Sequence, residues 1–597
     1  MATSSATSGA SETRPGDIGL RREVGLIGAI WASETSIIGS GWLFASMGAA
    51  AVAGPAIIYG WLIGGVCVII LALVHAELGG MYPVAGGTAR FPHLAFGSVA
   101  GIGFGFFSWL QAVTVAPVEV YAVIQYGSYY WQSTTNPTNQ WQNIFSGGRI
   151  TDLGFVMAIV LMAIFTGLNF LAVKYFARVS NTIMWWKLAV PVLTIIVLLF
   201  YFHGSNFTAG AGGQIAGAAK GTTNGSGGFM PFGIKAVFGA IPGAGLVFSY
   251  LGFEQADQLA GEIKNAQRNL PRAVIISCLI GTVVYIMAQV VFIGATPADL
   301  LHNGYAGIDA LGQIGTGHLG TQDAGLIGYP FAALAGLVGL RWLSIILHID
   351  ALVSPAGTGM IYQTSTSRVG YGLARNRYYP QVFQKTNRFG VPWVSLIVSF
   401  IAGLFFLLPF PSWQALVGLV TGASVLMYAG APLALAAFRK QVPEAVRPYR
   451  VPGAVWFAPL AFIVANMIIY WSGFVVIWKL GVCIAIGYIL IAVCMFFDKD
   501  RPKLDWRPAQ WMPVYIIGMG IISWLGQYPD VAVTGGAGAP PVNIDKIPFG
   551  IDIIVVVVFS LIIFYWAQAT KLSREEMMQR VEMQSVRMGD EDATPAE

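Results

Sequence analysis

The segment 34–44, ETSIIGSGWLF, carries a glycine–serine–glycine triplet inside an otherwise apolar run. A glycine costs about 1 kcal/mol in a helix interior, so Gly39 and Gly41 predict a break in a membrane helix. A broken helix exposes N–H groups on one half and carbonyls on the other, which suit a carboxylate and an ammonium. An α-amino acid carries both groups. Close helix packing through small residues is the alternative interpretation, because such packing is common in membranes.

A second interrupted segment, 238–265, reads FGAIPGAGLVFSYLGFEQADQLAGEIKN. Pro242, Gly243, Gly245 and Gly252 precede the acidic residue Glu254 in this segment. Unwound backbone is too costly in lipid to persist unless it lines a cavity or binds something. Two such segments at corresponding positions of internal repeats indicate the binding site of a transporter near the middle of the bilayer.

The composition is that of a membrane protein. Only 10% of the 597 residues are charged and 56% are hydrophobic, whereas soluble globular chains carry about 25% charged residues. The polar N-terminal stretch lacks the apolar core of a cleavable signal peptide. The four cysteines lie in apolar segments, and the chain has neither a phosphate-binding glycine loop nor metal-ligand spacing. We therefore expect no enzyme activity, cofactor, metal site or nucleic-acid partner.

The apolar runs predict an all-α polytopic protein with about fourteen transmembrane helices. Most of the 33 lysine and arginine residues then fall on one side of the membrane, which the positive-inside rule identifies as the cytoplasm. Both termini are predicted to lie there. The stretch 326–368 is too long for one crossing, so we expect a short external helix before a span that starts near Arg341. The expected spans begin near Val24, Gly54, Ser98, Leu153, Thr182, Gly233, Arg272, Trp342, Pro392, Ser412, Ala454, Phe474, Met512 and Phe549.

Five blocks of the sequence resemble the amino acid–polyamine–organocation (APC) transporter family, and they occur in order between about residues 25 and 395. They are IIGSGWLF, WLIGGVCVIILALVHAELGGMYPVAGGTARFPHLAFG, FSYLGFEQADQLAGEIKNAQRNLPRA, SRVGYGLARNRYYPQVFQKTNRFGVP and the pair Lys187–Leu188. The segments IGSGWLF and 341–355 are most similar to the aspartate–proton symporter branch of the family.

The resemblance implies a ten-helix core of two inverted five-helix repeats, with helices 1 and 6 broken and further spans outside the core. The expected divisions are a cytoplasmic N-terminal tail (1–22), the first repeat (23–202), an external glycine-rich loop (203–232), the second repeat (233–440), peripheral spans (441–570) and a cytoplasmic C-terminal tail (571–597).

By motif match, the residues at the two breaks would bind the backbone groups of an amino acid. The substrate carboxylate would contact the Ser40 hydroxyl and the amides of Gly39 and Gly41. Three backbone carbonyls would meet its ammonium, namely those of Ile37, Phe248 and Leu251. The resemblance also makes Phe248 an aromatic lid over the site.

Lys187, in the predicted span NTIMWWKLAVPVL, matches the lysine of the family's proton-coupled members. Because desolvation disfavours a charged amine, a lysine there can take up and release a proton during transport. Its ammonium would brace the first break in one state and release it in another. Snorkelling to the cytoplasmic face is the alternative. Glu254 matches a family glutamate, and we expect it to gate or support the second break rather than contact the substrate.

Six further polar residues are candidates because such groups inside a membrane are usually functional. Four of them are candidate proton sites or pocket residues, with a helix–helix hydrogen bond as an equal alternative: Glu119, His348, Asp350 and Ser354. Arg341 would attract an acidic substrate or anchor its helix at the interface. Glu34 lies one turn before the first break, where it would orient the half-helix or select against anions.

The sequence therefore predicts a plasma-membrane secondary transporter that imports an amino acid together with protons by alternating access. An acidic amino acid is the first expectation, from the branch resemblance. The acidic residues within the spans would instead suit a cationic amino acid or a polyamine. An exchanger on the same fold remains an alternative, as does an ion channel, for which the sequence carries no carbonyl-ring signature.

Overall fold

Helices make up almost all of the regular structure in the computed structural model, since a helix satisfies the backbone hydrogen bonds of an apolar segment internally. The structure describes residues 24–82, 87–128, 139–146, 149–170, 173–208, 228–258, 263–301, 329–407, 413–497, 502–528, 544 and 546–588. Most of the glycine-rich loop expected within 203–232, and the first 22 residues, lie outside the described residues.

The helices of the N-terminal half are α1 (Leu26–Ile37), α2 (Ser40–Ala53), α3 (Ile57–Met81), α4 (Gly87–Gly127), α5 (Asp152–Asn169), α6 (Val173–Leu199), α7 (Gly233–Gly243), α8 (Leu246–Tyr250), α9 (Glu254–Gln258) and α10 (Ala266–Ala295). Those of the C-terminal half are α12 (Pro330–Leu337), α13 (Arg341–Arg375), α14 (Trp393–Leu407), α15 (Trp413–Gln441), α16 (Ala454–Trp471), α17 (Phe474–Phe497), α18 (Trp506–Ala509), α19 (Trp511–Leu525), α20 (Ile551–Thr570) and α21 (Arg574–Met588). Short 3₁₀ turns occupy Gly54–Ala56, Gly204–Phe207, Ala298–Leu301 and Gln381–Gln384, and a small antiparallel hairpin pairs β1 (Phe145–Ser146) with β2 (Arg149–Ile150).

Nine helical segments among the described residues are long and apolar enough to cross a membrane. They include the continuous stretch α2–α3, as well as α4, α5, α10, α13, α15, α16, α17 and α20. The structure therefore has the all-helical, polytopic organisation that the sequence predicts. The count of about fourteen crossings and the repeat architecture stay predictions.

The helices sort into a buried centre and an apolar periphery. Helix α15 is buried along its apolar length and packs against α4, α3 and α16. Helix α1 packs against α6, α10 and α13, which brings four segments that are distant in sequence around the first break. Much of the apolar surface of α5, α17 and α20 is exposed. Lipid is the environment that such surfaces require.

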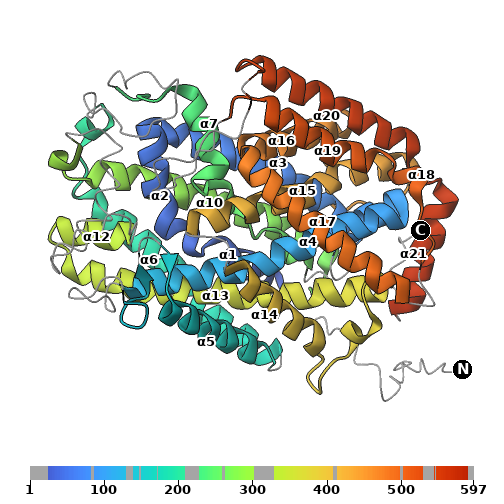
Figure 1. Ribbon diagram of the computed structural model, residues 1–597, viewed down its shortest axis with the longest axis horizontal. Helices are drawn as coiled ribbons and strands as arrows, with labels where there is room; N and C mark the ends of the chain where they lie inside the picture. The colour runs from blue at the N-terminus through green and yellow to red at the C-terminus, as the bar shows by residue number, and fades with distance from the viewer. Residues whose placement is uncertain are drawn as a thin grey trace, which may run out of the picture.

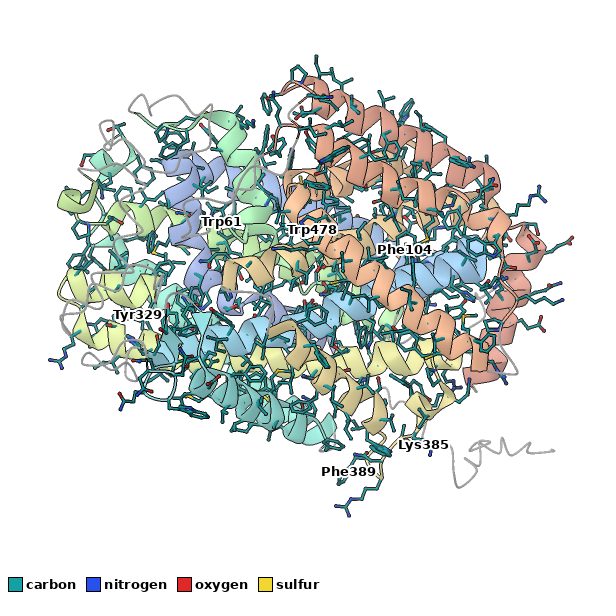
Figure 2. The ribbon with its side chains drawn as sticks, viewed as in Figure 1. Trp61, Phe104, Tyr329, Lys385, Phe389 and Trp478 are labelled. Atoms are coloured by element: carbon teal, nitrogen blue, oxygen red, sulfur yellow. The ribbon has the colours of Figure 1, made fainter. Side chains whose placement is uncertain are left out.

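Two long helices, α4 and α13, run along the long axis of the molecule, with α12 near one end and α21 at the other (Figure 1). Figure 2 places Tyr329, which precedes α12, near the first end, and Lys385 and Phe389 along the lower edge of the view. The expected short helix in the stretch 326–368 corresponds to α12, and the span that follows it begins at Arg341.

A buried charge cluster fastens α3 to the end of α15. Glu77 is fully buried at the end of α3 and accepts hydrogen bonds from Arg439 Nε at 2.8 Å and Nη2 at 2.7 Å. The amide of Val451 donates to the same carboxylate at 2.7 Å, and Arg447 approaches it at 3.2 Å. Glu77 therefore joins two helices and the loop that follows α15.

The C-terminal helix α21 docks on α4 through Asp505. The amide and hydroxyl of Ser98 both donate to Asp505 at 2.9 Å, and Arg580 of α21 donates at 2.5 Å. Partial burial alone would raise the pKa of Asp505, but the hydrogen bonds from Ser98 and the charge of Arg580 outweigh it and lower the pKa.

Candidate substrate and proton site

The first predicted break lies between α1, which ends at Ile37, and α2, which begins at Ser40. Gly39 adopts a non-helical conformation there, with φ −116° and ψ −141°. A Cβ atom on Gly39 would lie 2.7 Å from Thr358 Oγ1 and 2.8 Å from Glu119 Oε1. Glycine is therefore required because α4 and α13 approach the backbone too closely for any side chain.

The second predicted interruption divides its segment into α7, α8 and α9. Gly252, between α8 and α9, has φ +127°, which L side chains rarely adopt. A Cβ atom on Gly252 would also lie 2.6 Å from Ser36 Cβ and 2.8 Å from the amide nitrogen of Ile37. The two breaks thus touch each other, and the glycine at the second allows the last turn of α1 to pack against it.

A small cavity of about 10 Å³, which is room for about one water molecule, lies where the breaks meet. Four of the six predicted substrate-binding residues line it: Ile37, Gly39, Phe248 and Leu251. Its remaining lining residues are Ser36, Val115, Glu119, Thr358 and Tyr362. The other two predicted residues do not line the cavity. Ser40 is hydrogen-bonded to the lining residue Glu119, and Gly41 packs against Ser249 of α8.

Of the groups expected to bind a substrate carboxylate, the Ser40 hydroxyl is engaged by a carboxylate of the protein itself, whereas the Gly39 amide donates to the carbonyl of Ile37 at 3.0 Å. The amide of Ser40 donates to Glu119 Oε2 at 2.9 Å, and the Ser40 hydroxyl donates to Glu119 Oε1 at 3.1 Å. Trp413 Nε1 donates to the same hydroxyl oxygen at 2.9 Å. Glu119 is fully buried. The first turn of α2 therefore has the hydrogen-bonding capacity that a carboxylate needs.

The carbonyls expected to meet an ammonium are also engaged. The Tyr285 hydroxyl donates to the carbonyl of Ile37 at 2.6 Å, and the amide of Leu251 donates to the carbonyl of Phe248 at 3.0 Å. The Phe248 ring meets Trp413 edge to face, with centroids 5.7 Å apart. A carbonyl oxygen accepts two hydrogen bonds. The Ile37 carbonyl already has its second donor, the amide of Gly39 at 3.0 Å, whereas the Phe248 carbonyl has capacity for one more.

Lys187 of α6 is fully buried and lies at the first break. Its Nζ donates to the carbonyl of Thr35 at 2.5 Å and to Thr358 Oγ1 at 2.8 Å. Thr358 in turn donates to the Thr35 carbonyl at 2.8 Å. The lysine therefore links the last turn of α1 to α13, rather than extending to a membrane surface.

Glu254, at the start of α9, holds the second break. Its carboxylate accepts hydrogen bonds from Tyr428 at 2.5 Å, from the Gly252 amide at 2.9 Å and from Tyr362 at 3.0 Å. Gln111 and Gln255 donate to it at 3.2 and 3.3 Å. Glu254 does not line the cavity, and its contacts are those of a support for the backbone.

The polar residues of α13 lie in two regions. Asp350 accepts hydrogen bonds from Ser354 at 2.6 Å and from Trp42 Nε1 at 3.1 Å, which ties α13 to α2. His348 contacts the rings of Tyr126 and Tyr329, and Arg341 is exposed at the first residue of the helix. The structure does not place His348, Asp350, Ser354 or Arg341 on the cavity lining.

Glu34 is fully buried in α1, one turn before the break. Neither of its carboxylate oxygens has a hydrogen-bond partner within the part of the chain that the structure describes. Lys187 is the charged group with which Glu34 interacts electrostatically. Lys187 also interacts with Glu119 and Asp350, so three acidic residues surround one cation.

The sequence interpretation missed several residues of the site. Thr358 and Tyr362 continue the row begun by Asp350 and Ser354, with one polar side chain every fourth residue along one face of α13. This spacing was a usable signal. Trp413, which donates to Ser40, lies in the first turn of α15, where an aromatic residue in an apolar span gives no indication of a role.

Comparison with known proteins connects this chain with amino acid transport. The family model for amino acid permeases matches residues 24–522. The aspartate-proton symporter of Bacillus subtilis is 34% identical over 93% of this chain and 97% of its own length. The glutamate/serine transporter AimA of the same organism is 32% identical over 95% of this chain and 97% of its own length. The branched-chain amino acid permease BcaP is 24% identical over 82% of this chain.

These matches extend over both breaks and most of the helices, and the relatives are named as transporters. Together with the apolar helices, they identify a multi-pass membrane protein of amino acid transport. The chain belongs to the amino acid permease family of the APC transporters.

Proposed function

We propose that this protein imports an amino acid together with protons across the plasma membrane by alternating access. The observation that carries the proposal is the buried Lys187 ammonium, which binds the Thr35 carbonyl at the first break and Thr358 of α13. A lysine that is removed from water and placed between two helices can change their contact by gaining or losing a proton.

In the proposed cycle, the protonated ammonium holds the end of α1 against α13. Loss of the proton removes the charge that strengthens both hydrogen bonds, so α1 is released from α13. The substrate binds between the breaks once release of α1 from α13 enlarges the small cavity. The amide of Ser40 then meets its carboxylate, and the carbonyls of Phe248 and Ile37 meet its ammonium, with the ammonium replacing one of the two donors that Ile37 has in this structure. No covalent step takes place, since the work is done by binding and by proton exchange at Lys187.

We propose an acidic amino acid as the substrate, with serine as the second candidate. The names of two relatives, an aspartate-proton symporter and a glutamate/serine transporter, support this choice. Three lining residues carry hydroxyl groups, namely Ser36, Thr358 and Tyr362. Their O–H groups already donate within the protein, so their oxygens can accept a hydrogen bond from a substrate such as serine. The acidic residues Glu254 and Asp350 already accept several hydrogen bonds away from the lining, so they do not argue for a cationic substrate.

The domain organisation is part of the proposal. We infer two inverted repeats, at 23–202 and 233–440, with peripheral spans at 441–570 and with both termini in the cytoplasm. The interruptions at α1–α2 and at α7–α9 support this division, because each opens one of the proposed repeats.

The test is uptake of radiolabelled aspartate, glutamate and serine into vesicles that contain the purified protein. We expect accumulation in empty vesicles when the outside is made acidic, and loss of accumulation when a proton ionophore collapses the gradient. Uptake that needs internal amino acid and ignores the gradient would instead identify an exchanger. Conductance without saturable uptake would identify a channel.

A further inference from the structure

We propose that Glu119 is an internal occupant of the substrate's carboxylate site, and that its protonation frees Ser40 to bind the amino acid. One proton and one amino acid would then bind together, through a residue other than Lys187. This inference rests on the proposed function and adds a second proton site to it.

The Glu119 carboxylate occupies the position beside Ser40 that is proposed for the carboxylate of the substrate. Both oxygens of Glu119 are used, one by the Ser40 amide at 2.9 Å and one by the Ser40 hydroxyl at 3.1 Å. These donors belong to the first residue of α2, where unpaired amides and the helix dipole favour an anion. Glu119 also lines the cavity, and its Oε1 lies close to Gly39. An arriving carboxylate therefore meets these donors with Glu119 already bound to them.

The other acidic residues near the site are engaged differently. Glu254 accepts hydrogen bonds from several side chains and a backbone amide, and Asp350 from Ser354 and Trp42. Glu119 accepts its two hydrogen bonds from a single residue, which the cavity adjoins. Exchange of Glu119 for a substrate carboxylate would therefore break no hydrogen bond to any other residue.

The charged and titratable groups of the helices around Glu119 set the electrostatic balance. They are Glu34 on α1, Lys187 on α6, Glu254 on α9, Tyr285 on α10, Asp350 and Tyr362 on α13, Tyr428 on α15, and Tyr121 and Tyr126 on α4 itself. Among these, Lys187 is the cation, and it interacts with Glu119 directly. One cation cannot balance two adjacent carboxylates, because like charges at close range disfavour each other.

Protonation of Glu119 removes the repulsion between its carboxylate and that of the substrate, and the net charge of the site does not change. A proton from the outer solution binds a Glu119 oxygen, the ionised carboxylate becomes a neutral carboxyl group, and the negative charge of the substrate takes its place beside Ser40. When the substrate leaves toward the cytoplasm, the proton leaves Glu119 as well and the carboxylate returns to Ser40. The total charge near Lys187 is the same in both states, so neither state buries an additional unpaired charge.

The experiment measures the affinity of the purified protein for aspartate as a function of pH, by titration calorimetry. In the wild-type protein we expect the affinity to weaken by about tenfold per pH unit once Glu119 is ionised, as linkage to one proton requires. In Glu119→Gln this dependence should be absent. Asp552→Asn is the matched control: Asp552 is buried at the start of the peripheral helix α20, accepts a hydrogen bond from Tyr470 at 2.6 Å, and should leave the wild-type dependence intact.

A second measurement keeps the proposal testable if Glu119→Gln does not fold. Infrared difference spectroscopy of the wild-type protein, with aspartate minus without, should show a new protonated carboxyl band, and Glu119→Asp should shift that band. If Glu119→Gln keeps the full pH dependence, or if the wild-type protein binds aspartate without a new band, this inference is wrong while the proposed function stands. If no amino acid binds at any pH, the proposed function fails and this inference fails with it.

Discussion

Replacement of Lys187 with methionine should abolish proton-driven accumulation while preserving the fold. Methionine has a similar length and fills the same apolar space, but it neither carries a charge nor donates a hydrogen bond. The Thr35 carbonyl would lose the Lys187 ammonium and keep its hydrogen bond from Thr358 at 2.8 Å. No backbone acceptor at the break is therefore left without a partner.

The magnitudes follow from the two hydrogen bonds that Lys187 makes. A hydrogen bond to a charged group contributes about 1.5–3 kcal/mol, so the ammonium holds α1 against α13 with about 3–6 kcal/mol. Desolvation of the buried ammonium offsets most of this, but its removal also leaves Glu34, Glu119 and Asp350 without their cation, so we expect the free energy of unfolding to fall by about 3–5 kcal/mol. The effect on transport is larger, because release of this contact is the proposed coupling step.

The assay compares steady-state aspartate accumulation in vesicles with an imposed pH gradient. One pH unit is equivalent to about 1.4 kcal/mol, which limits accumulation to about tenfold when one proton moves with each substrate. We expect the wild-type protein to approach this value for each proton that moves with the substrate. In Lys187→Met the contact between α1 and α13 no longer responds to protons, so we expect exchange of internal for external aspartate but no net uptake. Lys187→Arg keeps a charge that cannot be released, so it too should fail to accumulate substrate. If Lys187→Met accumulates aspartate to the wild-type level, the assignment of proton coupling to Lys187 is wrong.

Three further predictions concern other parts of the structure. Gly39→Ala should remove aspartate binding in calorimetry, because its Cβ would lie 2.7 Å from Thr358 Oγ1; unchanged affinity would show that the backbone can shift. Glu77→Ala should lower the free energy of unfolding by about 3 kcal/mol in denaturant titration, since it leaves the half-buried Arg439 without its partner and the buried amide of Val451 without an acceptor; a loss below about 1 kcal/mol would mean that the pair is not stabilising. Folding lowers the pKa of Asp505. Asp505 therefore stabilises the protein at pH values above its unfolded-state pKa of about 4, and this contribution is lost as the pH falls through its lower, folded-state pKa. The thermal midpoints of wild-type protein and Asp505→Asn should therefore differ near neutral pH and converge in acid, and a constant difference would contradict the linkage.

The sequence was informative where local chemistry determines structure. Glycine and proline within apolar runs predicted the interruptions, because their effect on a helix does not depend on tertiary contacts. The boundary between a short helix and a span near Arg341 followed from length alone. The position of Lys187 beside the first break came from family resemblance, and no spacing rule would have indicated it.

The contacts between distant segments could not be predicted in the same way. A carboxylate within an apolar span indicates that a partner exists, but the partner of Glu119 is a backbone amide 79 positions away in the sequence. The donors to Glu254 come from α4, α13 and α15, whose relative rotation is set by packing of the whole bundle. Periodicity identifies the faces of such helices, but it does not identify which faces meet.

The unequal support of the two breaks has a mechanical consequence. The break at α8–α9 is fixed by neutral hydroxyl and amide donors that keep their protons at any physiological pH. The break at α1–α2 is held by an amine and a carboxylate, which both exchange protons with solution during the proposed cycle. The break at α8–α9 is thus expected to keep its conformation through the cycle, whereas the break at α1–α2 is expected to open and close with protonation. Amide hydrogen exchange at Ser40 should respond to substrate and pH more strongly than exchange at Gly252, and the reverse order would exchange the two roles.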